Sequence, residues 1–93
     1  MSDFRVFETE EFLSRLDRLQ AQDCAQIRKK LDKHVYPQLK REPFFGPNIK
    51  KLRGYTPDTW RYRIGVFRVF YTVNTKESVI YILSVDLRRD AYR

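Results

Sequence analysis

The side chains best suited to chemistry are the arginines of the segment 60–71, WRYRIGVFRVFY. On each side of Gly65-Val66 the residues alternate in character, which predicts two strands joined by a two-residue turn. Glycine at the first turn position suits a type II′ turn, because φ is positive there. This turn would fix the pairing of the strands, with Arg63 opposite Arg68 and Arg61 two residues along on the same face.

This arrangement of arginines favours a phosphate-binding site. Like charges placed opposite one another destabilise a hairpin, so an anionic partner would offset their repulsion. The guanidinium group stays charged and presents five donors in a planar fork that matches phosphate oxygens. In the alternative interpretation these side chains extend into water or pair with carboxylates such as Asp58 or Asp86. Three guanidinium groups on one face favour the phosphate interpretation.

The charge of the whole chain also indicates a polyanionic partner. The net charge is +7 and the pI is about 9.8. Residues 28–68 hold twelve lysines and arginines but only three acids, so the middle of the chain carries the charge. The basic surface of the helix predicted there is expected to be solvent-exposed and to assist through long-range attraction.

The remaining composition excludes several classes of protein. One cysteine, Cys24, and one histidine, His34, leave no internal disulfide and no cluster of metal ligands, so we expect neither a metal nor another cofactor. No segment approaches the roughly 20 apolar residues of a membrane span, and the N-terminus does not resemble a signal peptide. We therefore expect a cytoplasmic protein with no membrane partner, in which residues 1–93 form one domain.

Before the hairpin, the pattern predicts one strand and two helices. The strand lies within residues 3–8, and Thr9 caps a first helix. The apolar residues of this helix are expected to face the core, and they are Phe12, Leu13, Leu16 and Leu19. A second helix is predicted to begin at Asp23, with Gln26 in capping-box register.

The second helix carries an apolar residue at every fourth position, Ile27, Leu31, Val35 and Leu39. Pro37 is expected to kink or end it. Residues 41–50 are predicted to be a loop, in which Phe44 and Phe45 need cover from the core or from a partner.

Four strands are predicted in the second half of the chain. The first of them is a short strand at 50–54. A turn at 55–59 leads into the two hairpin strands, and a polar turn at 74–76 leads into the apolar run 78–85, which is expected to be covered on much of both sides. The tail from Asp86 is too polar for a core strand. The order β-α-α-β-β-β-β predicts an α+β fold, with two N-terminal helices packed on one face of a small, mainly antiparallel sheet.

The segments KKLRG, WRYRIGVFRVFY and VDLRRDAY, taken in this order of elements, resemble the RelE/ParE superfamily of toxins from toxin-antitoxin pairs. The resemblance runs over nearly the whole chain. It implies a basic pocket on the sheet, built from two cationic residues on the first hairpin strand, an arginine on the next strand, and an arginine and a tyrosine near the C-terminus. These positions are occupied here by Arg61, Arg63, Arg68, Arg88 and Tyr92. Arg88 and Tyr92 are assigned by the resemblance alone.

Further cations are expected to contact RNA around this pocket, namely Lys50, Lys51, Arg53 and Arg89. The sequence departs from well-known members, which have lysines in place of Arg61 and Arg63 and often Gly-His in place of Asp86-Leu87. Because guanidinium groups do not give up protons in proteins, these departures leave Tyr92 as the candidate proton-transfer group.

The resemblance implies one of three functions. RelE-like members are ribosome-dependent endoribonucleases that cut messenger RNA without a metal, by attack of a ribose 2′-OH on the adjacent phosphate. ParE-like members inhibit DNA gyrase without catalysis, and an inactive member would only bind an antitoxin. The sequence favours the first. The expected partners are a cognate antitoxin, with which a hetero-oligomer can form, and the ribosome with its messenger RNA.

Overall fold

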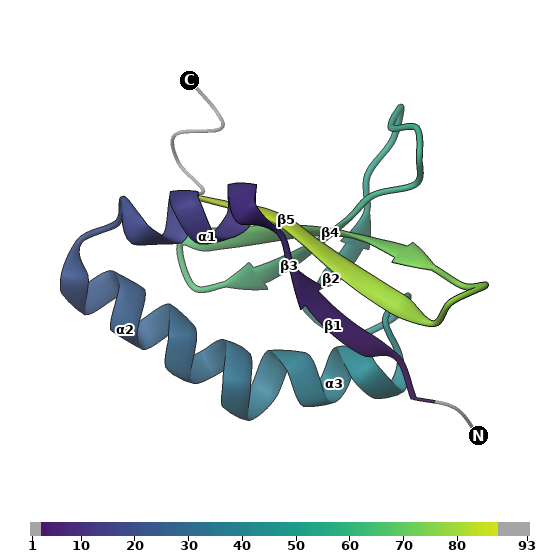
Figure 1. The fold of residues 1–93 in the computed structure, drawn as a ribbon, viewed down its shortest axis with the longest axis horizontal. Helices are drawn as coiled ribbons and strands as arrows, with labels where there is room; N and C mark the ends of the chain where they lie inside the picture. The colour runs from purple at the N-terminus through teal and green to yellow at the C-terminus, as the bar shows by residue number, and fades with distance from the viewer. Residues whose placement is uncertain (1–2, 88–93) are drawn as a thin grey trace.

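The computed structural model describes residues 3–87. It consists of a five-stranded sheet with helices covering one of its faces (Figure 1). The strands are β1 (Arg5–Glu8), β2 (Ile49–Lys51), β3 (Trp60–Ile64), β4 (Phe67–Asn74) and β5 (Val79–Leu87). The helical segments are α1 (Glu10–Asp17), α2 (Ala21–Lys30), a π-helical turn η1 (Leu31–Val35) and α3 (Tyr36–Arg41). The predicted α+β class and order of elements are confirmed.

The sheet has the order β1-β5-β4-β3-β2. β1 runs parallel to β5, and every other neighbouring pair is antiparallel. The first strand of the chain therefore lies beside the last described one. The helices that follow β1 return the chain to the opposite edge, where β2 begins.

The hairpin of β3 and β4 has the predicted register, with Arg63 opposite Arg68 and Trp60 opposite Tyr71. Gly65 has φ of +58°, whereas Val66 has no positive φ. A positive φ at the first central residue alone agrees with the predicted type II′ turn and excludes type I′.

α1 begins as predicted, because the Thr9 hydroxyl accepts a hydrogen bond from the Phe12 N–H at 3.2 Å. The same hydroxyl donates to the carbonyl oxygen of Ile82 at 2.7 Å, which fixes the start of the helix to β5. Phe12 and Leu16 are buried as expected. Leu13 is 43% exposed, so the prediction that it faces the core is wrong.

α2 begins earlier than predicted, at Ala21, and no side chain caps it. Asp23 therefore lies inside the first turn, where its charge interacts favourably with the helix dipole. Ala21 and Gln22 have good helix propensity, which accounts for the earlier start.

The helix does not end at Pro37, because α3 continues to Arg41. The backbone adapts just before the proline, in the π-helical turn η1. There the Tyr36 N–H donates to the carbonyl of Leu31, five residues back. Such a turn changes the position of the carbonyl that a proline ring would otherwise contact, so Pro37 lies inside the continuous helical segment 21–41.

Two strands differ in extent from the prediction. β2 is shorter and shifted, at Ile49–Lys51 in place of 50–54. β5 continues through Asp86 and Leu87, which were expected to belong to a polar tail. The side chains of β5 that point away from the helices, such as Tyr81 and Leu83, are half-buried, so that face of the strand is only partly covered.

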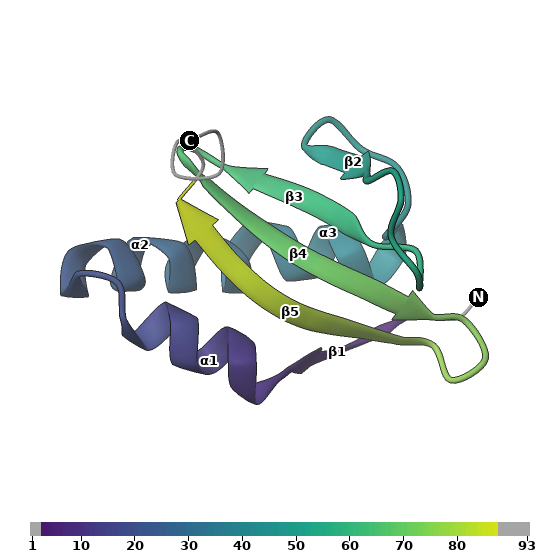
Figure 2. The ribbon, with the colours of Figure 1, turned by 90° about the horizontal axis from the view of Figure 1, so that it is seen from above.

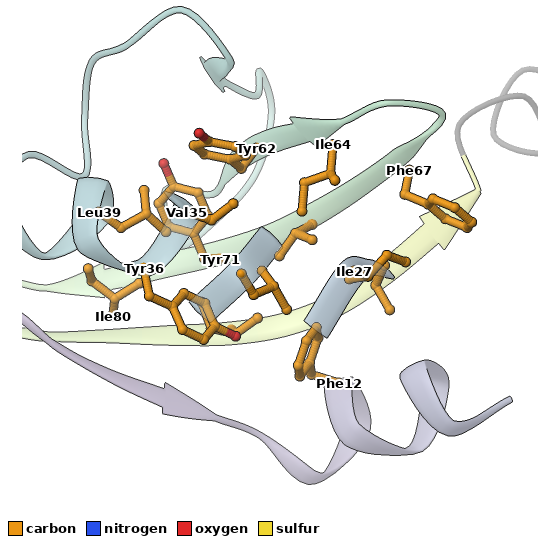
Figure 3. Close-up of a cluster of buried hydrophobic side chains, with 14 of the residues drawn as sticks. Phe12, Ile27, Val35, Tyr36, Leu39, Tyr62, Ile64, Phe67, Tyr71 and Ile80 are labelled. Carbon is orange, nitrogen blue, oxygen red and sulfur yellow. The ribbon is translucent and has the colours of Figure 1, made fainter. Parts of the chain in front are cut away.

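The core lies between the sheet and the helical segment (Figure 3). The four apolar residues predicted on the second helix, Ile27, Leu31, Val35 and Leu39, are all at most 2% exposed. They meet the inner face of the hairpin, where the buried Tyr71 hydroxyl donates to the Pro43 carbonyl at 2.6 Å. Phe44 packs at the edge of this core beside Trp60, with ring centroids 5.1 Å apart. Phe45 is 76% exposed.

A polar cluster joins β1 to the long helical segment. The Glu8 carboxylate accepts hydrogen bonds from Arg28 and, at 2.6 Å, from the Tyr36 hydroxyl. Burial raises the pKa of Glu8, but these two bonds outweigh it and hold the pKa below the usual 4.5. Burial and the bond to Glu8 raise the pKa of Tyr36. The cluster therefore favours the ionised carboxylate in the folded state.

Glu8 is expected to stabilise the protein only when it is ionised. Because its pKa is lower in the folded than in the unfolded state, its contribution is complete above the unfolded value and is lost as the pH falls through the folded value. Glu8→Gln should lower the free energy of unfolding at neutral pH by about 1–2 kcal/mol. In urea unfolding between about pH 3 and pH 7, the free energy of unfolding of Glu8→Gln should depend less on pH than that of the wild type. Glu77→Gln, in an exposed turn, is the control, and a parallel loss of stability in the two variants would contradict the assignment.

Within residues 3–87, no helix is both long enough and apolar enough to cross a membrane.

Candidate phosphate-binding site

The face of the sheet that α2 and α3 do not cover carries the arginines. Figure 2 looks onto this face, with α2 and α3 behind the strands. Tyr62 and Ile64 are buried toward the helices, so the intervening side chains of β3 point to the other side. Arg61 and Arg63 therefore lie on this outer face, and their partners on β4 share it.

Two rows of residues run across the outer face. In the first, Arg63 of β3 lies opposite Arg68 of β4, which lies opposite Asp86 of β5. Side chains directly opposite one another in an antiparallel pair have Cβ atoms about 4.5–5.5 Å apart, so these two arginines are direct neighbours. The first row places two positive charges side by side.

In the second row, Lys50 of β2 lies opposite Arg61, which lies opposite Phe70 and then Ser84. Lys50 is exposed and joins the cationic face. The two rows together place four cations of three neighbouring strands on one side of the sheet.

The arginines differ in their surroundings. Arg63 is exposed, whereas Arg61 and Arg68 are half-buried. The Arg61 Nε atom is buried and has no hydrogen-bond partner among residues 3–87. The Arg68 guanidinium lies over the Phe70 ring, 4.9 Å from its centroid. This contact holds the Arg68 guanidinium against the outer face of the sheet.

The two carboxylates named in the alternative interpretation have other partners. Asp58 pairs with Lys51 at 3.3 Å, and Asp86 pairs with Arg15 of α1 at 2.9 Å. In the described part of the chain, no ion pair involves Arg61 or Arg63. Their charge is thus available to a ligand.

Beside the arginines the outer face is hollowed, with a volume of about 290 Å³. Its floor consists of β4 and β5 side chains, Arg68, Phe70, Leu83 and Ser84. Tyr55 and Thr59 form a wall. They belong to the loop between β2 and β3, which rises from the side of the sheet away from α2 (Figure 1).

The other predicted RNA contacts are not all at this site. Lys51 lies opposite Trp60, so it points to the helix side, with its Nζ 5.9 Å from the Trp60 ring centroid. Arg53 is exposed in the loop that follows β2. Arg88, Arg89 and Tyr92 lie outside the described residues.

Neither the hollow nor the position of Tyr55 beside it was expected from the sequence. Phe70 lies opposite Arg61, as the predicted hairpin register requires, but its contact with Arg68 does not follow from that register. Tyr55 occurs in a polar, proline-containing loop whose path depends on tertiary contacts. An aromatic residue in such a loop, close in sequence to the cationic strands, was the one available signal.

The described outer face can bind phosphate through charge and hydrogen bonds. Arginine is a poor proton acceptor because its guanidinium stays protonated, so these side chains stabilise negative charge rather than transfer protons. Among residues 3–87 there is no group of three or more histidine, cysteine or acidic side chains suited to a metal ion.

A family model described as the ParE toxin of the type II toxin-antitoxin system parDE matches residues 6–92. No protein of curated function matches the sequence significantly. Among solved structures, the RelE-RelB complex from the archaeon Pyrococcus horikoshii is 31% identical, with 92% of this chain and 96% of that chain covered and a TM-score of 0.62.

Two further structures have the same fold. The RelBE2 toxin-antitoxin complex from Mycobacterium tuberculosis is 26% identical, with 92% of this chain and 99% of that chain covered and a TM-score of 0.72. The YoeB/ParE toxin from Agrobacterium tumefaciens is 20% identical, with 90% of this chain and 98% of that chain covered and a TM-score of 0.71. The last of these shows similarity of fold alone.

Proposed function

Because this chain belongs to the RelE/ParE superfamily and is a toxin of a type II toxin-antitoxin system, we propose that it is an endoribonuclease that cuts messenger RNA on the ribosome. The pairing of Arg63 with Arg68, beside Arg61 on the uncovered face of the sheet, is the observation that carries this proposal. Three guanidinium groups in this arrangement suit the backbone of a nucleic acid.

The proposed reaction is an internal phosphoryl transfer. The ribose 2′ oxygen forms a bond to the adjacent phosphorus while the bond from phosphorus to the 5′ oxygen breaks, leaving a cyclic phosphate and a 5′-hydroxyl. Arg61, Arg63 and Arg68 would stabilise the charge on the phosphate oxygens. Arg88 would contribute a further positive charge to this stabilisation. Tyr92 would take the 2′-OH proton, while the departing 5′ oxygen gains a proton from a second donor.

An antitoxin is the proposed protein partner. Several of the similar solved structures are RelB-RelE complexes. Exposed apolar residues of this chain, such as Phe45, Val66 and Leu13, are suitable contacts for a partner chain. We also place the protein in the cytoplasm, where ribosomes carry their messenger RNA.

Inhibition of DNA gyrase is the second candidate function. The observation in its favour is the description of the matching family model, which is that of a ParE toxin. In that case the cationic face would contact a protein or its bound DNA without chemistry. A third outcome is an inactive member that binds only its antitoxin.

Inducing the protein in cells and following the incorporation of labelled methionine and labelled thymidine separates these candidates. We expect protein synthesis to stop first, with new 5′-hydroxyl ends appearing in messenger RNA. An early stop of DNA synthesis with intact messenger RNA would contradict the nuclease proposal and would support gyrase inhibition instead. No effect on either would identify an inactive member, once pull-down had shown that the protein is folded and binds an antitoxin.

A further inference from the structure

We propose that the hollow beside the arginines binds an unpaired nucleobase of single-stranded RNA, with the Tyr55 ring stacked on the base. This inference rests on the proposed function, because it concerns the nucleotide whose backbone the arginines hold. It assigns a role in positioning RNA to Tyr55, which lies in the loop between β2 and β3.

Tyr55 has the properties of a stacking residue. Tyr55 is 54% exposed although it borders the hollow, and among residues 3–87 its ring contacts no other aromatic ring and no cation. A tyrosine ring that is exposed on a folded surface costs little conformational entropy when a base stacks on it. Single-stranded RNA is commonly bound by stacking its bases on aromatic rings.

The floor of the hollow offers a second flat surface. The Arg68 guanidinium already lies over the Phe70 ring, at 4.9 Å from its centroid. Guanidinium planes and aromatic rings both stack on nucleobases. The hollow of about 290 Å³ lies at the lower limit of the roughly 300–1,000 Å³ typical of small-molecule pockets, which suits one base better than a larger ligand.

The chemistry of the lining favours a base over a phosphate. Asp86 borders the hollow, and although its carboxylate pairs with Arg15 of α1 at 2.9 Å, it keeps further acceptor sites for the amino or imino groups of a base, which are donors that a phosphate lacks. Ser84 adds a hydroxyl that can donate or accept. Arg61 and Arg63 lie on β3, next to the hollow and not in its lining, where they can hold the adjoining phosphates.

The test uses the full chain and a labelled single-stranded RNA whose riboses are 2′-O-methylated, so that it cannot be cut. Affinity is measured by fluorescence anisotropy for the intact RNA and for a series with one abasic site at successive positions. We expect one abasic position to weaken binding about tenfold. Tyr55→Ala should weaken binding of the intact RNA by a similar factor. In this variant, removing the base at that position should cause no further loss of affinity.

Two variants control this experiment. Tyr55→Phe keeps the ring and should bind as wild type does. Phe45→Ala removes another exposed aromatic ring that does not border the hollow, so it should retain the abasic effect. Circular dichroism tests whether the Tyr55→Ala variant is folded. We expect it to be, because Tyr55 lies in an exposed loop.

The outcomes separate this inference from the proposed function. If every abasic RNA bound as tightly as the intact one, while Arg63→Ala weakened binding, the base site would be refuted and the phosphate site retained. An abasic effect that Tyr55→Ala did not remove would place the base elsewhere and would also refute it. If the abasic effect depended on Tyr55 but no messenger RNA were cut on ribosomes, the base site would stand and the nuclease proposal would fail.

Discussion

Arg63→Ala is expected to slow cleavage of messenger RNA on stalled ribosomes by about 100- to 1,000-fold, the loss typical of removing one pre-positioned donor from developing negative charge. Arg63 lies directly opposite Arg68 on the uncovered face, and no ion pair within residues 3–87 occupies it. The effect should appear in single-turnover rates at saturating enzyme, because the guanidinium interacts most strongly with the charge of the transition state.

The side chain of Arg63 is exposed, so its removal should leave the fold intact and even relieve repulsion from Arg68. Unfolding in urea should therefore show equal or higher stability. Arg41→Ala, an exposed arginine at the end of α3, is the matched control and should cut at the wild-type rate. Arg63→Lys should recover part of the rate, since it keeps the charge but loses the fork. A wild-type rate for Arg63→Ala would remove this residue from the mechanism, and an unchanged rate for Tyr92→Phe would do the same for the proposed base.

The hairpin could be predicted residue by residue, because its determinants are local. Alternation over 60–64 and 67–71 defines two faces, and Gly65-Val66 fixes the loop length. In a strand pair these two facts leave one register, since a slip by one residue would turn the apolar side chains to the solvent. The cationic face followed directly from that register. The loop bearing Tyr55 has no such periodicity, so its place over the outer face could not be read from the sequence.

The second helix could be predicted only in part. Its apolar residues were identified correctly, but they lie four residues apart, and at 3.6 residues per turn each step overshoots one turn by about 40°. Over Ile27 to Leu39 the stripe would drift by about 120° around a regular α-helix. The π-helical turn at Leu31–Val35 winds more slowly and returns the stripe to the core, where all four residues are buried. The spacing of four was the signal of the π-helical turn, but it was interpreted as an ordinary helix that Pro37 would kink or end.

Deleting Lys33 is expected to lower the free energy of unfolding by about 3 kcal/mol, the usual cost of proline inside a helix. Lys33 is an exposed residue of the π-helical turn. Without it the apolar residues would be spaced by four, three and four, which fits a regular α-helix on one face. The i→i+5 bond from Leu31 to Tyr36 would then give way to regular α-helical bonding, and the Pro37 ring would meet the carbonyl four residues before it. Urea unfolding followed by circular dichroism measures the loss.

The same deletion combined with Pro37→Ala isolates the proline. It should recover most of the lost stability, because a continuous α-helix would then bury the same stripe without a steric conflict. Pro37→Ala alone should change stability by less than about 1 kcal/mol, since the π-helical turn already accommodates the ring. If the combined variant were as unstable as the deletion alone, the cost would come from shortening the helix against the sheet. The π-helical turn would then serve to set the length of the segment between β1 and β2, and not to admit Pro37.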